Sequence, residues 1–239
     1  MRGVTVGSEV SVAVLQSHYL PWFGYFDLLG ACDYFVIYDH VDYTKNSFQN
    51  RNRLRGANGY FWLTVPVKTS SRFGQSLESV EIADDRWSRR HWSAVRQTLT
   101  GTTHFQDFKS EWEEAFMGIS QSSSLSRVSE VFLRLISQQL RLKTTILRDS
   151  DLSIVNTDRN LKLVEICEKL GARTYRTGLS ALNYLDSKAF SNHGIQVQTI
   201  VYSNYGRLPN QLSVSTLQTM AEFGTNTTSL LKSSFETLI

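Results

Sequence analysis

The chain opens with short apolar runs that alternate with polar turns. The run at 10–15 is apolar at nearly every position, which is typical of a strand buried on both faces. Apolar residues at helical spacing follow Pro21, which suits the first turn of a helix, and they end near Gly30. A second apolar run covers 34–38. A strand, a helix and a strand in this order predict a right-handed βαβ unit with parallel strands.

The middle of the chain has a different pattern. Between 86 and 142, apolar residues recur at intervals of three or four positions, as Trp87, Trp92, Val95 and Leu99 illustrate. This spacing places their side chains on one face of a helix. We therefore expect a helical subdomain in this region.

The last third returns to an α/β pattern. A helix is predicted at 160–170, and Gly171 stands where helices commonly end. The apolar run at 195–202 predicts a last strand, and the tail from 225 to 234 is polar. The remaining expected strands lie at 60–68, 77–82, 145–147 and 174–177.

These patterns predict an α/β fold with a mostly parallel sheet and an inserted helical subdomain. The first α/β half would span 1–85 and carry the polar segments described below. The helical subdomain would span 86–142, and the second α/β half, which completes the sheet, 143–239.

Composition limits the class of protein. With 239 residues, of which 41% are apolar and 20% charged, the chain can bury a core and does not have a disordered composition. The net charge of +3 permits an anionic ligand but does not by itself indicate a nucleic-acid-binding protein. Cys32 and Cys167 form no disulfide framework or thiolate metal site, and the histidines are dispersed, so no metal site is predicted.

Targeting signals are not evident in the sequence. The first residues lack the apolar stretch of a signal peptide, and no run approaches the roughly twenty apolar residues of a membrane span. Two cysteines without a pairing pattern suit a reducing compartment. We therefore expect a cytoplasmic protein without a membrane span.

Polar side chains with forked or charged ends are dense between 16 and 53. In one loop, such groups can grip a diphosphate or a carboxylate. The alternative is a solvated charged loop, which is the usual structure of such runs. The expected ligand-binding residues of the second half of this stretch are Lys45, Gln49, Asn50, Arg51, Asn52 and Arg53.

His18 and Asp39 follow the first two predicted strands and are the candidates for catalysis. His18 can act as a general base or donate to a phosphate, and the alternative is a turn histidine bonded to the backbone. Asp39 can be a base or a metal ligand, and the alternative is a cap or turn residue. Tyr19, Trp22 and Tyr25 can stack on a sugar or a base, or pack in the core.

Four segments resemble the signatures of the WbqC-like protein family. The first, 16–27, reads Gln-Ser-His-Tyr-Leu-Pro-Trp-Phe-Gly-Tyr-Phe-Asp. The second, 39–53, reads Asp-His-Val-Asp-Tyr-Thr-Lys-Asn-Ser-Phe-Gln-Asn-Arg-Asn-Arg. Shorter similarities lie at 62–67 and 178–195. Together they extend over most of the chain.

Two positions depart from the family pattern. The family usually has proline after the opening glutamine, and here Ser17 stands there. The family also tends to carry an aspartate near its end, where this chain has Leu-Gln-Thr-Met at 217–220. A role that depends on that aspartate therefore has no counterpart here.

The resemblance implies a function in the biosynthesis of bacterial surface polysaccharides such as O-antigen and lipopolysaccharide. Members are proposed to transfer glycine or another amino acid to the amine of an amino sugar. The resemblance also extends the expected substrate-binding set to Gln16, Gly24, Ser180 and Tyr184, in addition to the residues named above.

The first signature also resembles the start of the nucleotidyltransferase-like fold, a Rossmann-like type also called HUP. In that fold a histidine-bearing turn follows a strand, and a glycine at the helix start lets a phosphate approach the backbone. His18, Pro21 and Gly24 occupy these places, but Tyr25 replaces the second histidine of that signature. The similarity therefore favours the fold more than adenylyl transfer.

The leading hypothesis is a transferase that adds an aminoacyl or acyl group to the amine of an amino-sugar nucleotide. The donor stays open between an activated amino acid, an aminoacyl-tRNA and an acyl thioester, and the mild net charge gives no special support for tRNA. One alternative is an ATP-dependent adenylating enzyme or ligase on the same fold. Another is a non-catalytic sugar-nucleotide-binding or interaction module. The leading hypothesis places six residues around one cleft: Gln16, His18, Asp39, Lys45, Asn50 and Arg51.

Overall fold

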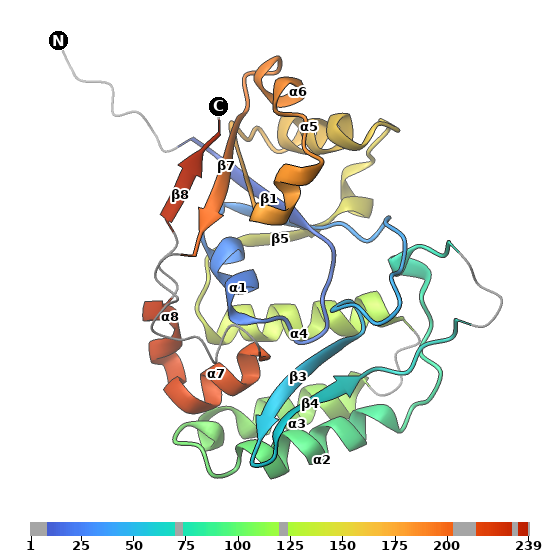
Figure 1. Ribbon diagram of the computed structural model, residues 1–239, viewed down its shortest axis with the longest axis vertical. Coiled ribbons are helices and arrows are strands. Elements are labelled where there is room, and N and C mark those ends of the chain that lie inside the picture. Colours follow the sequence, from blue (N-terminus) through green and yellow to red (C-terminus); the bar gives the residue numbers. More distant parts are fainter. Residues whose placement is uncertain (1–8, 70–73, 120–123, 203–213, 231–233, 239) are drawn as a thin grey trace.

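The computed structural model describes residues 9–69, 74–119, 124–202, 214–230 and 234–238, and a six-stranded sheet lies in its upper half in the view of Figure 1. Its strand order is β5-β2-β1-β6-β7-β8. The first five strands in this order are parallel, and β8 runs antiparallel to β7. The strands are Ser11–Leu15 (β1), Tyr34–Ile37 (β2), Thr145–Arg148 (β5), Thr174–Thr177 (β6), Gln196–Val201 (β7) and Ser234–Thr237 (β8).

The predicted βαβ unit at the start of the chain is confirmed. β1 and β2 are parallel neighbours, with Val12 opposite Tyr34, and the helix α1 (Phe23–Gly30) connects them. β7 lies in the same sheet, as the apolar run at 195–202 predicted. Numbered along the chain, the parallel strands have the order 3-2-1-4-5, which is that of Rossmann-like sheets. The predicted α/β fold class is therefore confirmed.

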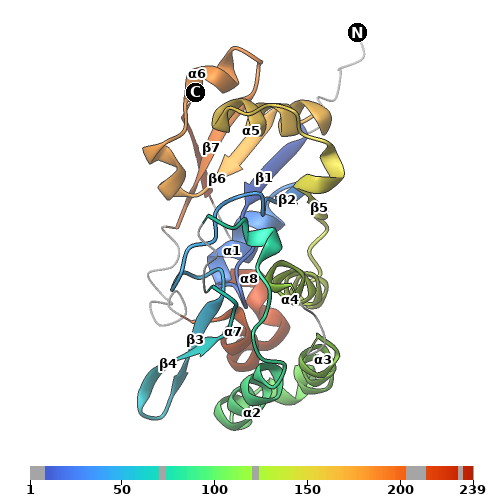
Figure 2. The same cartoon turned by 90° about the vertical axis from the view of Figure 1, so that its right-hand side faces the viewer.

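Helices cover both faces of the sheet (Figures 1 and 2). Side chains of β1 alternate between the two layers because successive residues of a strand point to opposite faces. Ala13 packs in the cluster that contains α1 and α4 (Leu125–Gln139). Val12 and Val14 pack in the cluster that contains α5 (Arg159–Lys169), which explains the nearly continuous apolar run.

The helical region expected over 86–142 contains α2 (Trp87–Leu99), α3 (Phe105–Gly118) and α4. Trp87 and Trp112 are fully buried in the core cluster that these helices share with one face of the sheet. A helix from the end of the chain, α7 (Thr216–Phe223), packs against α3. The C-terminal third therefore contacts the helical region as well as adding strands to the sheet.

The polar run around Arg51 is a strand, so the expectation of a basic loop is wrong. β3 (Arg51–Gly56) pairs with β4 (Gly59–Thr64) in an antiparallel hairpin that forms a separate sheet. Asn52 and Leu54 are buried, whereas the arginines alternate with them on the outer face. The alternation has the two-residue period of a half-buried strand. It is hard to recognise in the sequence because the buried positions include an asparagine instead of only apolar residues.

Two further differences concern shorter elements. Leu77–Ser79 form a 3-10 helix instead of the strand expected at 77–82, where Glu81 and Ile82 make isolated bridges. The polar tail includes α8 (Thr227–Leu230), and β8 follows it. Two other connections are short helices: Leu179–Asn183 is a 3-10 helix, and Ser187–Ser191 forms α6.

Candidate functional site

The sheet has a point where its connections diverge. β2 lies on one side of β1 and β6 on the other, so the segments that follow β1 and β6 separate beyond their carboxyl ends. Ligands bind at such switch points in open parallel sheets. A cavity of about 400 Å³ opens here. Its lining residues are Val14, Leu15, Gln16, His18, Tyr38, Val41, Arg159, Leu163, Tyr175, Ser180 and Tyr184.

Four of the residues expected from the sequence line this cavity: Gln16, His18, Ser180 and Tyr184. Gln16 and His18 come from the segment that follows β1, and the other two follow β6. The first signature and the C-terminal similarity therefore meet at one place, although more than 150 positions separate them in the sequence.

The His18 ring is half-buried in the cavity wall, between Tyr25 and Phe48 at centroid distances of 5.4 and 6.1 Å. Its Nδ1 atom is buried and has no hydrogen-bond partner among the described residues. Burial lowers the pKa of His18 from its usual 6.5 to about 4, so the ring is neutral at pH 7. No described protein group at Nδ1 fixes the tautomer of the ring.

Gln16 is held by contacts with both signatures. Its side-chain oxygen accepts a 2.8 Å hydrogen bond from Gln49, and its backbone carbonyl accepts one of 3.1 Å from the Tyr25 hydroxyl. The other end of the Gln49 amide accepts from the Thr44 backbone N–H at 2.6 Å. Gln49 therefore connects the second signature to the first. Gln16 lines the cavity, whereas Gln49 does not.

Asp39 is fully buried and does not line the cavity. One carboxylate oxygen accepts from the Ser17 backbone N–H at 2.8 Å; the other accepts from the Ser17 hydroxyl at 2.8 Å and from the Ser126 hydroxyl. Burial raises the pKa of Asp39, and the bonds from Ser126 and Ser17 oppose this shift. The expectation that Asp39 faces the same cleft as His18 is wrong, because its hydrogen bonds turn it toward the protein interior.

The contacts of Ser17 explain why serine can replace the family's usual proline at this position. Its N–H and its hydroxyl both donate to Asp39. A proline at this position would have neither donor. The serine therefore ties the turn that carries His18 to the end of β2.

Several other expected site residues are buried, and their side chains form hydrogen bonds within the protein that stabilise the fold. Asn50 donates to the Val65 carbonyl at 3.0 Å, and Asn52 donates to the Leu20 carbonyl at 2.7 Å. Leu20 has a φ of 45°, which leucine rarely adopts, so the Asn52 bond holds a strained turn. The Tyr19 hydroxyl lies 2.8 Å from His91 Nδ1 in the core. None of Tyr19, Asn50 and Asn52 lines the cavity.

Gly24 has a different role from the expected one. An ideal Cβ at this position would lie 2.2 Å from a ring carbon of Trp22, so the indole fills the space above the helix start. The Trp22 ring also lies 5.4 Å from the ring of Tyr202. The expectation that a phosphate approaches the backbone at Gly24 is therefore wrong in this arrangement.

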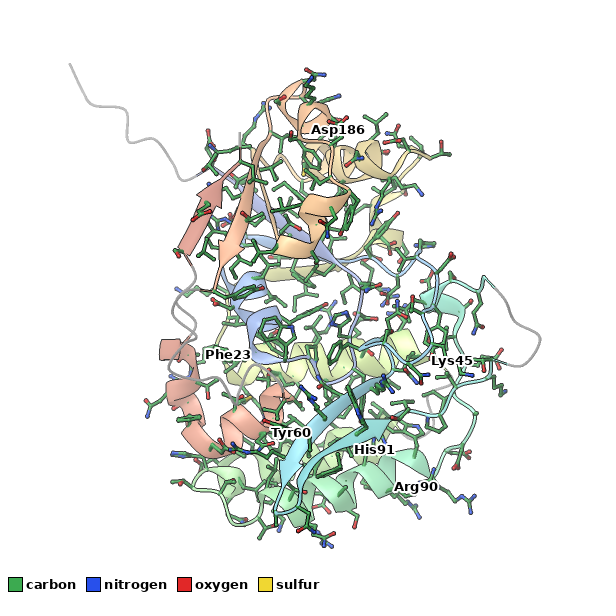
Figure 3. All side chains as sticks on the ribbon, in the orientation of Figure 1. Phe23, Lys45, Tyr60, Arg90, His91 and Asp186 are labelled. Carbon is green, nitrogen blue, oxygen red and sulfur yellow. The ribbon has the colours of Figure 1, made fainter. Side chains whose placement is uncertain are left out.

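The cations of the second signature lie outside the cavity lining. The Arg51 guanidinium donates to the Asn46 carbonyl and lies 4.3 Å from the Trp62 ring centroid. Arg53 lies over Tyr60 at 4.8 Å. Lys45 is exposed in the loop before the hairpin, and Figure 3 labels it beyond the open end of the hairpin. The expectation that Lys45, Asn50 and Arg51 share the cleft of His18 is wrong.

Arg159 is the cationic residue of the cavity wall, and sequence reasoning did not identify it. It is the first residue of α5, whose N-cap Asp158 accepts from two backbone N–H groups. Its guanidinium carbon lies 3.5 Å from the ring centroid of Tyr184. The feature of the sequence that could have identified Arg159 is an arginine at the start of a helix that follows a parallel strand.

A second cavity of about 500 Å³ adjoins the ends of β2 and β5 and shares Tyr38 with the first. His40 lines it, with Nδ1 2.7 Å from Asp149 and Nε2 3.1 Å from Glu78. His40 lies in the second signature, and sequence reasoning did not identify it as a site residue. Among the described residues, no group of three or more histidine, cysteine, aspartate or glutamate side chains could hold a metal ion.

Comparison with known proteins agrees with the signatures at this site. The model of the WbqC-like protein family matches residues 16–228, which is most of the chain. The protein belongs to the WbqC-like family. Its similarity also extends to the uncharacterized protein Rv1507c of Mycobacterium tuberculosis, at 32% identity over 81% of this chain and 83% of the relative. No solved structure matches the chain significantly. In the described part of this WbqC-like protein, no helix is long and apolar enough to cross a bilayer.

Proposed function

We propose that the protein is a transferase that adds an aminoacyl group, such as glycyl, or another acyl group to the amine of an amino-sugar nucleotide. Its product would enter the biosynthesis of a bacterial surface polysaccharide such as O-antigen. The observation that carries the proposal is the cavity at the switch point of the sheet, which both His18 and Arg159 line.

Arg159 is the group that would hold the diphosphate. A guanidinium is always charged and presents a planar fork of donors to phosphate oxygens. Stacking on Tyr184 limits the rotation of the guanidinium, which lowers the entropy lost when a ligand binds. Of the residues that line the cavity, Arg159 is the one with a permanent positive charge.

His18 would take the proton of the attacking amine. The amine nitrogen forms a bond to the acyl carbonyl carbon, the bond from that carbon to the donor breaks, and the imidazole accepts the proton that the nitrogen loses. Burial keeps the ring neutral at pH 7 but also makes it a weak base. A bound diphosphate would raise the pKa of His18, because a nearby negative charge favours the protonated form.

Calorimetry with a panel of amino-sugar nucleotides, followed by turnover with candidate acyl donors, tests the proposal. His18→Ala should leave the affinity of the sugar nucleotide within about twofold and lower turnover by roughly 10²–10⁴, the range for loss of a general base. His193→Ala is the matched control, because His193 is partly exposed and pairs with Glu168 away from the cavity lining. Binding by no member of the panel, or full turnover in His18→Ala, would contradict the proposal.

The second candidate is an ATP-dependent adenylating enzyme. The order of the parallel strands favours it, because nucleotides bind at the switch point of such sheets. Binding of ATP in calorimetry together with pyrophosphate release would favour this candidate. Binding of the sugar nucleotide, together with no pyrophosphate release from ATP, would favour the transferase.

A further inference from the structure

The outer face of the β3–β4 hairpin interleaves arginines with exposed aromatic rings. Arg53 is the cross-strand partner of Trp62, and Arg55 is the partner of Tyr60. The Trp62 and Tyr60 side chains are 43% and 46% exposed, although the opposite face of the hairpin is buried. Arg51 and Arg53 lie over these rings, at 4.3 Å from Trp62 and 4.8 Å from Tyr60. Figure 3 labels Tyr60 on this hairpin.

All charged residues in the sequence around this hairpin are positive. Residues 43–68 contain no aspartate or glutamate, and their five cations are Lys45, Arg51, Arg53, Arg55 and Lys68. Because the whole chain has a net charge of +3, the rest of the chain is net negative. In the structure, Arg55 pairs with Glu222 at 3.5 Å and Lys68 with Glu81 at 2.8 Å, both acids from outside this segment. The net positive charge of the hairpin region therefore comes chiefly from Lys45, Arg51 and Arg53, and it complements a polyanion.

Neighbouring aromatic rings connect the hairpin face to a residue of the cavity lining. The Trp62 ring lies 6.0 Å from the ring of Phe48, and Phe48 lies 6.1 Å from His18. Phe48 is itself 43% exposed. An aromatic track thus runs from Tyr60 through Trp62 and Phe48 to a residue of the cavity wall.

We propose that this track binds a single-stranded RNA and leads its terminal ribose to the cavity, so that the acyl donor is an aminoacyl ester of RNA. Proteins bind single strands by combining cations that follow the phosphates with aromatic rings on which bases stack. A glycan would use the rings but would not need the concentration of positive charge. The inference rests on the proposed function, because that function supplies a use for an RNA end beside His18.

The chemistry balances without a further reactant. The amine of the amino-sugar nucleotide attacks the ester carbonyl, and a carbon–nitrogen bond replaces the carbon–oxygen bond to the ribose. The proton lost by the amine passes through His18 to the ribose oxygen, which leaves as a hydroxyl. The products are an amide on the sugar and a deacylated RNA.

Fluorescence anisotropy with a labelled single-stranded RNA of about twelve nucleotides, within the usual site size, tests the binding. Trp62→Ala should weaken RNA binding by about 5- to 150-fold, the range for one lost base stack. Arg51→Ala should reduce the salt dependence by about 0.7 in the slope of log affinity against log salt. Arg89→Ala, an exposed arginine on α2, is the matched control and should change neither value.

The results of these experiments distinguish failure of the RNA inference from failure of the proposed function. No RNA binding, an unchanged affinity in Trp62→Ala, or equal affinity for DNA of the same sequence or for an anionic polysaccharide would overturn the inference. Calorimetry on the same preparation reports whether the amino-sugar nucleotide still binds the cavity. If it binds but aminoacylated RNA gives no mass-shifted sugar product, the donor assignment fails and the cavity site stands. If the sugar nucleotide does not bind, the proposed function fails independently.

Discussion

Arg159 stacks on Tyr184, with its guanidinium carbon 3.5 Å from the ring centroid. The arginine begins α5, and the tyrosine follows β6, so the pair joins two elements on one wall of the cavity. A stacked guanidinium keeps its in-plane donors available to a ligand. The pair therefore presents a positive charge at the edge of the sheet where the proposed substrate has its diphosphate.

Arg159 should contribute to sugar-nucleotide affinity, and Arg51 should not. Arg159→Ala should weaken binding by about 1.5–3 kcal/mol, the range for a lost hydrogen bond to a charged group. Arg51→Ala should leave this affinity unchanged, because Arg51 lies on the hairpin outside the cavity lining. Isothermal titration of both variants with the same amino-sugar nucleotide measures the difference. A larger loss in Arg51→Ala would move the diphosphate site to the hairpin.

Asp39 should matter for stability rather than for proton transfer. Asp39→Ala removes a buried carboxylate that accepts from Ser17 and Ser126 and lies 3.8 Å from the buried Arg148 guanidinium, and we expect a loss of about 3 kcal/mol or more in the free energy of unfolding. Asp42→Ala is the matched control: Asp42 is exposed, and the change should stay within about 0.5 kcal/mol. Urea unfolding gives both values. Wild-type stability with lost turnover in Asp39→Ala would return a catalytic role to this residue.

Gly24 should tolerate no side chain while Trp22 keeps its position. A Cβ at Gly24 would lie 2.2 Å from the indole, so Gly24→Ala should destabilise the fold by about 1–3 kcal/mol through overpacking. Gly118→Ala is the control, because no atom of the described residues outside its own helix lies within 4 Å of the added Cβ. Adding Trp22→Leu should recover much of the loss in thermal unfolding. An unchanged melting temperature in Gly24→Ala would show that the indole does not occupy this space.

Acid should weaken the fold through His18 and His91, whose rings lose hydration when the chain folds. Burial lowers the pKa of both His18 and His91 to about 4, whereas the unfolded chain titrates near 6.5. Between these values the unfolded state binds more protons, so stability is full above pH 6.5 and falls as the pH drops toward 4. Each histidine contributes at most about 1.4 kcal/mol per pH unit to this slope. His91→Asn should therefore flatten the dependence of unfolding free energy on pH. An unchanged slope between pH 6.5 and 4 would contradict the buried, neutral state.

The parallel core was predictable because its pattern is local. The runs at 10–15 and 34–38 are apolar on both faces, and a short connection between parallel strands requires a helix, so α1 and the parallel pairing followed. The β3–β4 hairpin was harder to predict, since its outer positions are arginines and its inner ones include Asn52. The inward asparagine is explained by its hydrogen-bond partners, the Leu20 carbonyl and the Arg53 backbone N–H, which the sequence does not reveal.

The candidate site was predictable in part for a similar reason. His18 and Gln16 directly follow the first strand, where ligands commonly bind. Arg159 lines the same cavity because β6 inserts beside β1, and no local pattern reveals that strand order. Asp39 also follows a strand, but two serines turn it inward, and one of them lies 87 positions away in the sequence.

A crystal structure of the protein with a bound amino-sugar nucleotide tests the central claim most directly. The account predicts that the diphosphate contacts Arg159 and that the sugar amine lies near His18, within the cavity at the ends of β1 and β6. It also predicts no direct contact between the nucleotide and Asp39. A nucleotide bound in the second cavity beside His40 and Asp149, or on the outer face of the β3–β4 hairpin, would contradict this site.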